Sequence, residues 1–155
     1  MKARADILIV DDEQVVRLSH LRSLATANFD ATAVGSGTEA IRLMECHRFD
    51  IVFLDIRMPD MDGITVLKTI KQRWPECEVI IITGFPTIDT AKEAVTLGAY
   101  NYLVKPVSPG DVVGAAKEAL RHKHWALRKI IRQKDGTEKI ENRFWINELP
   151  AQFAR

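Results

Sequence analysis

Short apolar runs alternate with longer stretches of helical periodicity five times along most of the chain. The apolar runs lie at residues 6–10, 31–34, 51–54, 79–82 and 100–104. Three of these runs contain the continuously apolar segments ILIV, IVFL and VIII. Such segments are typical of strands in a parallel sheet that is buried on both faces. The pattern therefore predicts five strands, each followed by a helix.

The segments between the runs place apolar residues at i, i+3, i+4 and i+7, the pattern of a helix with one apolar face. The first three sets are Val15, Leu18, Leu21, Leu24 and Ala25; Ala40, Leu43, Met44 and His47; and Ile64, Leu67, Ile70 and Trp74. The fourth set is Ile88, Ala91, Val95 and Leu97. Gly98 stands where a glycine ends a helix. Ser108, Pro109 and Asp111 predict the start of the fifth helix, as N-cap, first-position proline and first-turn acid.

Five alternating βα units predict an α/β fold, a three-layer sandwich around a parallel sheet. Right-handed crossovers leave few topologies, and the flavodoxin-like (βα)5 strand order 2-1-3-4-5 is the one we expect. The fifth helix meets no Pro and no Gly after residue 115 until Asp135-Gly136, so we expect it to run from about Pro109 to about Lys134. This extended C-terminal helix divides the chain into a domain at residues 1–122 and a helical extension, linker and tail at 123–155.

The extended helix carries an apolar seam that predicts pairing with a second copy of the chain. Val113, Leu120 and Leu127 recur every seven residues, and Ala116 and Ile130 supply most of an alternate series that Lys123 interrupts. A lone helix would leave the apolar side chains near residue 130 in water. A short further helix is expected around Ile140–Leu149, and a frayed tail remains the alternative.

The composition favours an ordinary folded protein that acts in the cytoplasm. Hydrophobic residues make up 46% and charged residues 28% of the 155 positions. The longest apolar runs fall short of the roughly 18 residues that a membrane helix needs. The apolar stretch that ends at Val10 runs directly into three acids, so it is too short for a signal-peptide core of about 7–15 residues. Cys46 and Cys77 have no CxxC spacing and predict no disulfide framework.

The charge is distributed unevenly between the two parts of the chain. Residues 1–120 carry 13 basic and 17 acidic side chains, whereas residues 121–155 carry 9 basic and 4 acidic ones. An acidic domain therefore precedes a basic tail. Nine basic residues spread over this segment form no dense patch, so we expect no direct binding of nucleic acid by this chain.

Polar residues follow four of the predicted strands, at the edge where open α/β sheets bind their ligands. The residues are Asp11, Asp12 and Glu13 after the first strand, Asp55 after the third, Thr83 and Gly84 after the fourth, and Lys105 after the fifth. In the order 2-1-3-4-5 the first and third strands are neighbours. Asp11, Asp12 and Asp55 are therefore expected to meet in one crevice.

Three carboxylates in one crevice repel one another unless a cation joins them. A site made only of oxygen ligands suits Mg²⁺, and Mn²⁺ shares this preference. Lys105 and the hydroxyl of Thr83 add a positive charge and a donor for the oxygens of a tetrahedral anion. These are the parts that phosphoryl transfer needs, and an aspartate can itself form an acyl phosphate. Each residue alone would be more often a helix cap or a solvated charge, but the combination favours a site.

The motifs at these strand ends resemble the receiver domain of bacterial two-component response regulators. They are Val10-Asp11-Asp12-Glu13, the segment LDIRMPDMDG at 54–63, Ile82-Thr83-Gly84 and Tyr102-Leu103-Val104-Lys105-Pro106. The resemblance covers residues 6 to about 122 and includes every signature position. It implies that Asp55 accepts a phosphoryl group from a phosphohistidine of a sensor histidine kinase, in a Mg²⁺-dependent reaction of phosphorelay signalling.

The same resemblance implies a role for each neighbouring residue. Asp11, Asp12, Asp55 and the backbone carbonyl of Arg57 would hold Mg²⁺. Lys105, Thr83 and Gly84 would bind the phosphoryl group, Thr83 and Tyr102 would act as the switch, and the Lys105-Pro106 bond would be cis. Arg57 and Phe85 lie two positions beyond the acceptor and the switch threonine. They would restrict the attacking water and prolong the phosphoryl lifetime.

The implied output is a change of binding surface, not classical catalysis. The surface of the fourth helix, fifth strand and fifth helix would signal to a downstream effector protein or domain. A homodimer would form through that surface or through the extended fifth helix. One alternative is a Mg²⁺-dependent phosphatase that acts through an aspartyl phosphate. Another is the N-terminal part of a larger DNA-binding transcriptional regulator, since about 33 tail residues cannot hold such a domain.

Overall fold

Five strands and five helices alternate along the chain in a computed structural model that describes residues 4–134, with the side chains of residues 4–126. The elements are β1 Asp6–Val10, α1 Gln14–Thr26, β2 Asp30–Val34, α2 Gly37–Cys46, β3 Ile51–Leu54, α3 Gly63–Arg73, β4 Glu78–Thr83, α4 Ile88–Thr96, β5 Asn101–Val104 and α5 Pro109–Lys134. The five predicted strands and the five helices that follow them are present, with boundaries that differ by a few residues at most.

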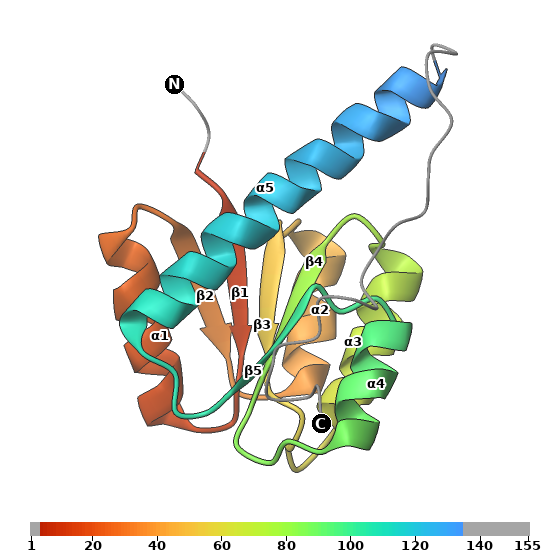
Figure 1. The fold of residues 1–155 in the computed structure, drawn as a ribbon. Coiled ribbons are helices and arrows are strands. Elements are labelled where there is room, and N and C mark those ends of the chain that lie inside the picture. The colour runs from red at the N-terminus through yellow and green to blue at the C-terminus, as the bar shows by residue number, and fades with distance from the viewer. Residues whose placement is uncertain (1–3, 135–155) are drawn as a thin grey trace.

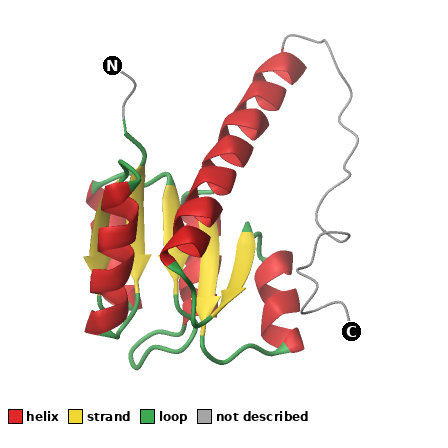
Figure 2. Cartoon of the chain, turned by 60° about the vertical axis from the view of Figure 1, so that its left-hand side comes forward, coloured by secondary structure: helices red, strands yellow, loops and turns green. Residues whose placement is uncertain are grey.

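The strands form one parallel sheet in the order β2-β1-β3-β4-β5, which confirms the predicted flavodoxin-like topology. Helices α1 and α5 cover one face of the sheet, and α2, α3 and α4 cover the other (Figure 1). The view turned by 60° shows α5 continuing well past the edge of the sheet (Figure 2). No helix within residues 4–134 is long and apolar enough to cross a membrane.

Alternate residues of each buried strand enter two separate apolar clusters, because successive strand side chains point to opposite faces. Leu8, Val52 and Ile81 pack with residues of α2, α3 and α4. Ile9 and Phe53 pack with residues of α1 and α5 on the other face. The central strands are apolar on both faces for this reason, and their carboxyl ends meet at one edge of the sheet.

The apolar face predicted for α1 is wrong at both ends, because Ala25 is exposed as well as Val15 and Leu18. Val15 and Leu18 are 80% and 46% exposed. The buried side of α1 carries His20, Ser23 and Leu24 instead. Ser23 can be buried because its hydroxyl donates to the backbone carbonyl of Ser19 at 2.9 Å, so the polar group is satisfied within the helix. A pattern of apolar residues alone cannot reveal a buried face that is partly polar.

The predicted helix ends and the predicted start of α5 are confirmed. Gly98 follows α4 with φ of +97°, a conformation that glycine adopts without steric cost. The backbone N–H of Asp111 donates to Ser108 Oγ at 3.1 Å, and the backbone N–H of Ser108 donates to Asp111 Oδ2 at 2.9 Å. The Lys105-Pro106 peptide bond is cis, as the resemblance implied.

Helix α5 reaches Lys134 as predicted, but the predicted seam belongs partly to the domain itself. Ala116 is fully buried in the cluster beneath α1 and α5, so it cannot contact a second copy. Lys123, expected to interrupt the seam, places its ammonium group 2.8 Å from Asp50, the residue before β3. Leu120 also packs against the cluster beneath α1 and α5, so this part of the predicted seam is used within the domain. The helix expected around Ile140–Leu149 lies outside the described residues.

Candidate functional site

The carboxylates of Asp11, Asp12 and Asp55 lie together at the carboxyl ends of β1 and β3. One oxygen from each lies within 4.8 Å of the other two. The two strands are neighbours, and the backbone N–H of Asp55 donates across the pair to the carbonyl of Val10 at 3.0 Å. Asp11 and Asp55 are buried, whereas Asp12 is exposed. The crevice expected from the strand order is therefore present.

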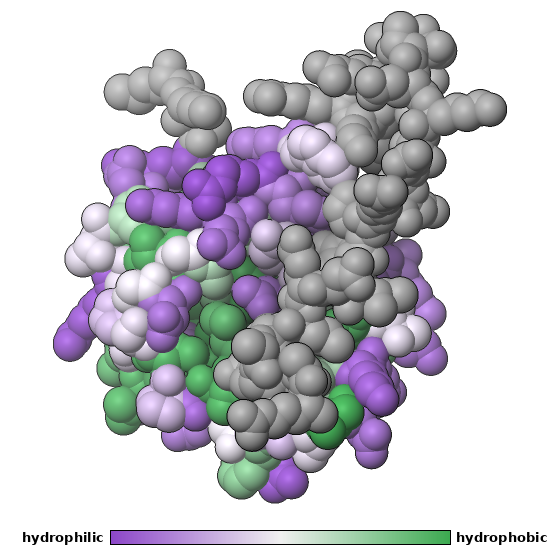
Figure 3. Space-filling view, viewed as in Figure 1, coloured by the Kyte–Doolittle hydropathy of each residue, from purple (hydrophilic) through white to green (hydrophobic). Residues whose placement is uncertain are grey.

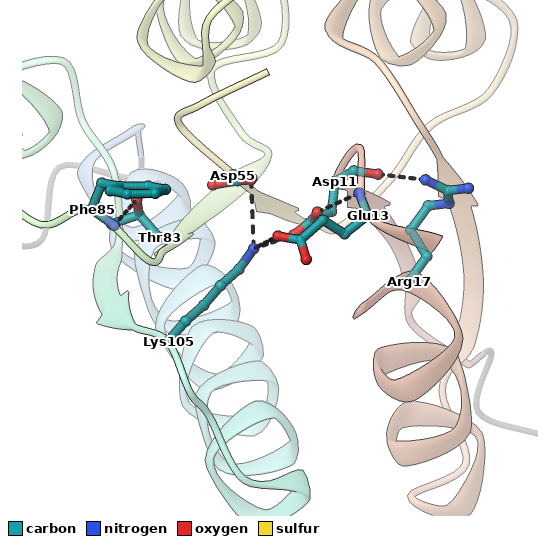
Figure 4. Close-up of polar contacts among 7 residues, drawn as sticks. All are labelled: Asp11, Glu13, Arg17, Asp55, Thr83, Phe85 and Lys105. Carbon is teal, nitrogen blue, oxygen red and sulfur yellow. Dashed lines mark hydrogen bonds and ion pairs between the residues drawn. The ribbon is translucent and has the colours of Figure 1, made fainter. Parts of the chain in front are cut away.

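Lys105 reaches from the end of β5 into this carboxylate cluster (Figure 4). Its Nζ lies 2.8 Å from Asp11 Oδ2 and 3.5 Å from Asp55 Oδ2. The exposed carboxylate of Glu13 lies 3.5 Å from the same ammonium group. A single lysine thus offsets the charge of several acids, and its flexible side chain can follow a negative group that enters the crevice.

Burial and neighbouring charges shift the titration of this cluster. Burial is the main cause that raises the pKa of Asp55 to about 6, and the charge of Asp11 adds to it, while Lys105 opposes it. Burial alone would lower the pKa of Lys105. Its hydrogen bond to Asp11 and the charges of Asp11, Asp55 and Glu13 outweigh that effect and raise the pKa. The lysine is therefore a fixed positive charge at neutral pH.

The donor set of the crevice fits a hard divalent cation. It contains three carboxylates and no nitrogen or sulfur ligand, and the oxygens are close enough together to share one ion. Two of the three carboxylates are buried, where uncompensated negative charge is costly. Magnesium prefers oxygen ligands and commonly uses only a few protein carboxylates while keeping water. Asp11, Asp12 and Asp55 are thus chemically suited to Mg²⁺.

The loop between β3 and α3 is held tightly against Asp55. A Cβ atom on Gly63 would overlap the backbone oxygen of Asp55, so only glycine fits at this position. The backbone N–H of Gly63 donates to the carbonyl of Ile56 at 2.7 Å. Asp62 caps α3 by accepting from the backbone N–H of Thr65 at 3.0 Å. The start of α3 therefore fixes the backbone that carries Asp55.

Thr83 and the residues beside it form the other side of the crevice. Thr83 is fully buried at the end of β4, and its Oγ1 accepts from the backbone N–H of Phe85 at 3.1 Å. Gly84 lies beside the aliphatic part of Lys105. The guanidinium carbon of Arg57 lies 4.1 Å from the centroid of the Phe85 ring. Arg57 and Phe85 come from different loops and meet through their side chains.

Tyr102 is buried on β5, with only 2% of its surface exposed. Its hydroxyl lies 2.9 Å from Thr90 Oγ1 on α4. The switch expected from the sequence has the ring turning inward when Thr83 moves. In this structure the ring is already inside, so any movement starts from a buried position.

Four residues of this region receive no site role from the sequence. Arg17 on α1 donates from Nη1 to the backbone carbonyl of Asp11 at 2.9 Å (Figure 4). Glu13 directly follows the two aspartates, but the sequence does not show that its carboxylate faces Lys105. The spacing of Thr87 and Thr90 matches a capping box and could have marked the start of α4. It could not have shown the contact between Thr90 and Tyr102.

Comparisons with known proteins agree with this geometry. A family model described as the response regulator receiver domain matches residues 7–117. The DNA-binding transcriptional regulator NtrC of Escherichia coli (strain K12) is 37% identical over 119 residues, which are 77% of this chain and 25% of that protein. The chain therefore spans about a quarter of the length of this relative.

Two solved structures share the fold of the described residues. The CheY-like response regulator receiver domain protein from Methanospirillum hungatei JF-1 has a TM-score of 0.78 and 27% identity, covering 80% of this chain and 99% of that one. NtrX from Brucella abortus has a TM-score of 0.75 and 28% identity, covering 90% of this chain and 31% of that one.

Proposed function

The chain belongs to the family of response regulator receiver domains, and we propose that its Asp55 accepts a phosphoryl group from a sensor histidine kinase in the cytoplasm. The observation that carries the proposal is the convergence of Asp11, Asp12 and Asp55 within 4.8 Å, with Lys105 Nζ 3.5 Å from Asp55. A carboxylate oxygen of Asp55 attacks the phosphorus atom of the donor. The bond between phosphorus and the histidine nitrogen breaks, an acyl phosphate forms, and the imidazole leaves.

The carboxylates of Asp11, Asp12 and Asp55, with the backbone carbonyl of Arg57, would hold Mg²⁺, and Mn²⁺ also fits this donor set. The bound ion supplies positive charge that offsets the negative charge of the transferring group. Asp11 and Asp55 are both buried beside Lys105, and Asp55 is the proposed nucleophile because the receiver motif places the acceptor there and the loop held by Gly63 fixes its backbone.

Lys105 exchanges partners in the proposed reaction. Its ammonium group pairs with Asp11 at 2.8 Å. A cation held by the carboxylates would neutralise Asp11 in place of Lys105. The ammonium group of Lys105 could then pair with the oxygens of a phosphoryl group on Asp55. The Thr83 hydroxyl and the backbone N–H of Gly84 would donate to the same oxygens. Lys105 therefore binds the phosphoryl group, while the carboxylates bind the metal ion.

The proposed signal is a change of the surface formed by α4, β5 and α5. Donation from the Thr83 hydroxyl to a phosphoryl oxygen would draw Thr83 away from its place beside Phe85. Tyr102 lies on the neighbouring strand and would turn into the space that Thr83 leaves. The movement biases a surface with two alternative arrangements, which is how a local charge change reaches a partner.

Exposed apolar residues on both sides of the crevice support docking of the kinase at this edge. Val15 and Leu18 lie on α1, Phe85 lies in the loop before α4, and Ile88 is the first residue of α4. Hydrophobic residues gather on the lower part of the face in Figure 3, towards the carboxyl ends of the strands, and hydrophilic ones at the end where α5 leaves. A helical partner that rests on these residues would bring its phosphohistidine over Asp55.

We further propose that α5 connects the switch to its output, an effector protein or a further domain. Pairing of two copies through the part of α5 beyond Lys123, or through the surface of α4, β5 and α5, would form a homodimer. Sedimentation of the protein over a range of concentrations tests this, and a monomer at all concentrations would contradict it.

The phosphatase alternative is less well supported by the residues around Asp55. A dedicated hydrolase needs an acid or base to activate the leaving group and the water. The position two residues after the nucleophile carries Arg57, which stacks on Phe85 and cannot deprotonate water. Receiver domains are phosphoacceptors, and slow loss of the phosphoryl group is the hydrolysis we expect here.

Phosphorylation of the purified protein by acetyl phosphate with Mg²⁺ tests the proposal, with intact-mass measurement as the readout. We expect one added phosphoryl group on wild-type protein and none on Asp55→Asn, which keeps the shape but removes the nucleophile. Lys105→Ala should retain Mg²⁺ binding and lose most of the conformational response. Persistent acid-labile phosphorylation of Asp55→Asn would refute the assignment of the acceptor.

A further inference from the structure

The hydroxyl groups of Tyr102 and Thr90 join β5 to the first turn of α4. Their oxygens lie 2.9 Å apart. The ring of Tyr102 is buried in the apolar cluster beneath α2, α3 and α4, so its hydroxyl reaches α4 from the core side. A buried phenol requires a hydrogen-bond partner, and Thr90 provides one.

Thr90 also completes the N-terminal cap of α4. The backbone N–H of Thr90 donates to Thr87 Oγ1 at 3.0 Å, and the backbone N–H of Thr87 donates to Thr90 Oγ1 at 3.3 Å. The two threonine hydroxyls lie 2.8 Å apart, and Thr90 Oγ1 lies 3.1 Å from the backbone carbonyl of Thr87. One hydroxyl donates a single proton and accepts at two positions. The Thr90 hydroxyl therefore divides its bonds between the cap and Tyr102.

Helix α4 is held to the domain by little apolar surface, which makes these polar bonds more important. Its buried residues are Ala91 and Ala94, whereas α3 buries the larger Val66, Leu67 and Ile70. The free energy of burial scales with apolar area, so two alanines contribute little. Elements with few buried apolar contacts are the ones that move at low cost. The N-terminal turn of α4 is thus sensitive to what Thr90 binds.

We propose that Thr90 is the positioning residue that holds Tyr102 inward and transmits movement of its ring to the start of α4. This deepens the proposed function and rests on the switch role of Tyr102. When the ring turns toward the space left by Thr83, its bond to Thr90 is lost. The Thr90 hydroxyl then bonds only to Thr87 in the N-terminal cap, and the first turn of α4 changes its position. Thr90 acts through Tyr102 and touches neither Asp55 nor the phosphoryl group.

Fluorine NMR of protein labelled with 3-fluorotyrosine tests the proposal, because the chain has only two tyrosines. Tyr102→Phe assigns the two signals. Thr90→Val keeps the shape of the side chain and removes the hydroxyl. We expect the Tyr102 signal to shift toward that of a solvated ring, with about a fivefold rise in the exposed population, the factor for one neutral hydrogen bond. Thr90→Ser should restore the wild-type signal.

Thr96→Val is the matched control on the same helix, because the Thr96 hydroxyl donates to the carbonyl of Lys92 at 2.9 Å, within α4. It should leave the Tyr102 signal unchanged. An unmoved signal in Thr90→Val, an equal shift in Thr96→Val, or no rescue by Thr90→Ser would each overturn the role of Thr90.

The same samples are then measured with Mg²⁺ and beryllofluoride, a stable mimic of the phosphoryl group. We expect the mimic to shift the Tyr102 signal of the wild type, and to shift that of Thr90→Val less. An equal shift in both proteins would overturn the coupling. If the wild-type protein does not respond, the proposed phosphoacceptor function fails, while the comparison without the mimic still decides whether Thr90 holds the ring.

Discussion

The ammonium group of Lys123 lies 2.8 Å from Asp50 Oδ1, at the point where α5 leaves the domain. The other oxygen of Asp50 accepts from the backbone N–H of Asp6 at 2.9 Å. The carboxylate of Asp50, the residue before β3, therefore joins the start of β1 to the projecting helix α5. Burial alone would raise the pKa of Asp50. The hydrogen bonds from Lys123 and Asp6, with the charges of Lys123 and His124, outweigh it and lower the pKa.

The first prediction is that Asp50→Asn lowers the free energy of unfolding by about 1 kcal/mol at pH 7, the value for a partly exposed charge-assisted bond. Because the pKa is lower in the folded state, this stabilisation is present above the unfolded value of about 4 and is lost as the pH falls through the folded value. Urea denaturation at pH 7 and pH 3 measures it.

Asp30→Asn is the control for this measurement, because Asp30 forms an exposed pair with Arg4 at 3.6 Å. We expect it to change the free energy of unfolding by less than about 0.5 kcal/mol. A cost as large as that of Asp50→Asn would mean that position 50 has no special role in holding α5.

The second prediction concerns Gly63, whose missing side chain lets α3 begin against the backbone of Asp55. Gly63→Ala would force its Cβ into the Asp55 carbonyl oxygen. We expect a loss of more than about 2 kcal/mol of stability and slower phosphorylation of whatever protein folds. Gly114→Ala on α5 is the matched control, because nothing lies within 4 Å of its added Cβ. Alanine there should be neutral or stabilise by up to about 1 kcal/mol.

The third prediction is that the stacked pair of Arg57 and Phe85 slows loss of the phosphoryl group by restricting water. The guanidinium carbon lies 4.1 Å from the ring centroid. Such a pair contributes about 0.5–1 kcal/mol at an exposed site. Arg57→Ala and Phe85→Ala should therefore each accelerate dephosphorylation about two- to fivefold. The decay of labelled acyl phosphate gives the rate.

Arg73→Ala provides the comparison, because Arg73 stacks on Trp74 at 4.5 Å at the C-terminal end of α3. Arg73→Ala removes a cation–π contact that lies outside the phosphorylation site. The dephosphorylation rate of this variant should therefore stay at the wild-type value. Unchanged rates in the Arg57 and Phe85 variants would show that the pair does not control access of water.

The strands and most helix boundaries could be predicted because they depend on local periodicity and on capping residues such as Ser108. The carboxylate crevice could be predicted too, since strand order alone brings Asp11 and Asp55 to one edge. Contacts between side chains from distant elements could not. The pair of Lys123 and Asp50 spans 73 positions. The sequence marks both as charged but says nothing of which surface charges meet.

The buried face of α1 shows a second limit of the sequence. Hydrophobic spacing selected Val15 and Leu18, yet the helix turns His20 and Ser23 toward the sheet. Apolar patterns assume that polar residues stay in water. That assumption fails where a hydroxyl bonds its own helix, as in Ser23, or where an imidazole is buried in its neutral form. The packing of neighbouring elements decides such cases.

The last prediction follows from His20, which is 5% exposed and packs beside Phe53 with ring centroids 6.4 Å apart. Among residues 4–134 its Nδ1 has no hydrogen-bond partner. Burial lowers the pKa of His20, the charge of Asp11 opposes this, and that of Lys105 adds to it. His20 in the unfolded chain therefore becomes protonated near pH 6.5, whereas in the folded protein it stays neutral until a lower pH is reached.

Stability should consequently fall as the pH drops below about 6.5, by up to about 1.4 kcal/mol per pH unit until the lower folded pKa is reached. His20→Leu removes the titratable imidazole and keeps an apolar group against Phe53. Compared with the wild type, this variant should lose about 1 kcal/mol less between pH 7 and pH 5.5 in urea denaturation. His20→Gln should flatten the pH dependence in the same way, because glutamine does not titrate. Parallel curves for all three proteins would mean that His20 is protonated in the folded state as readily as in the unfolded chain.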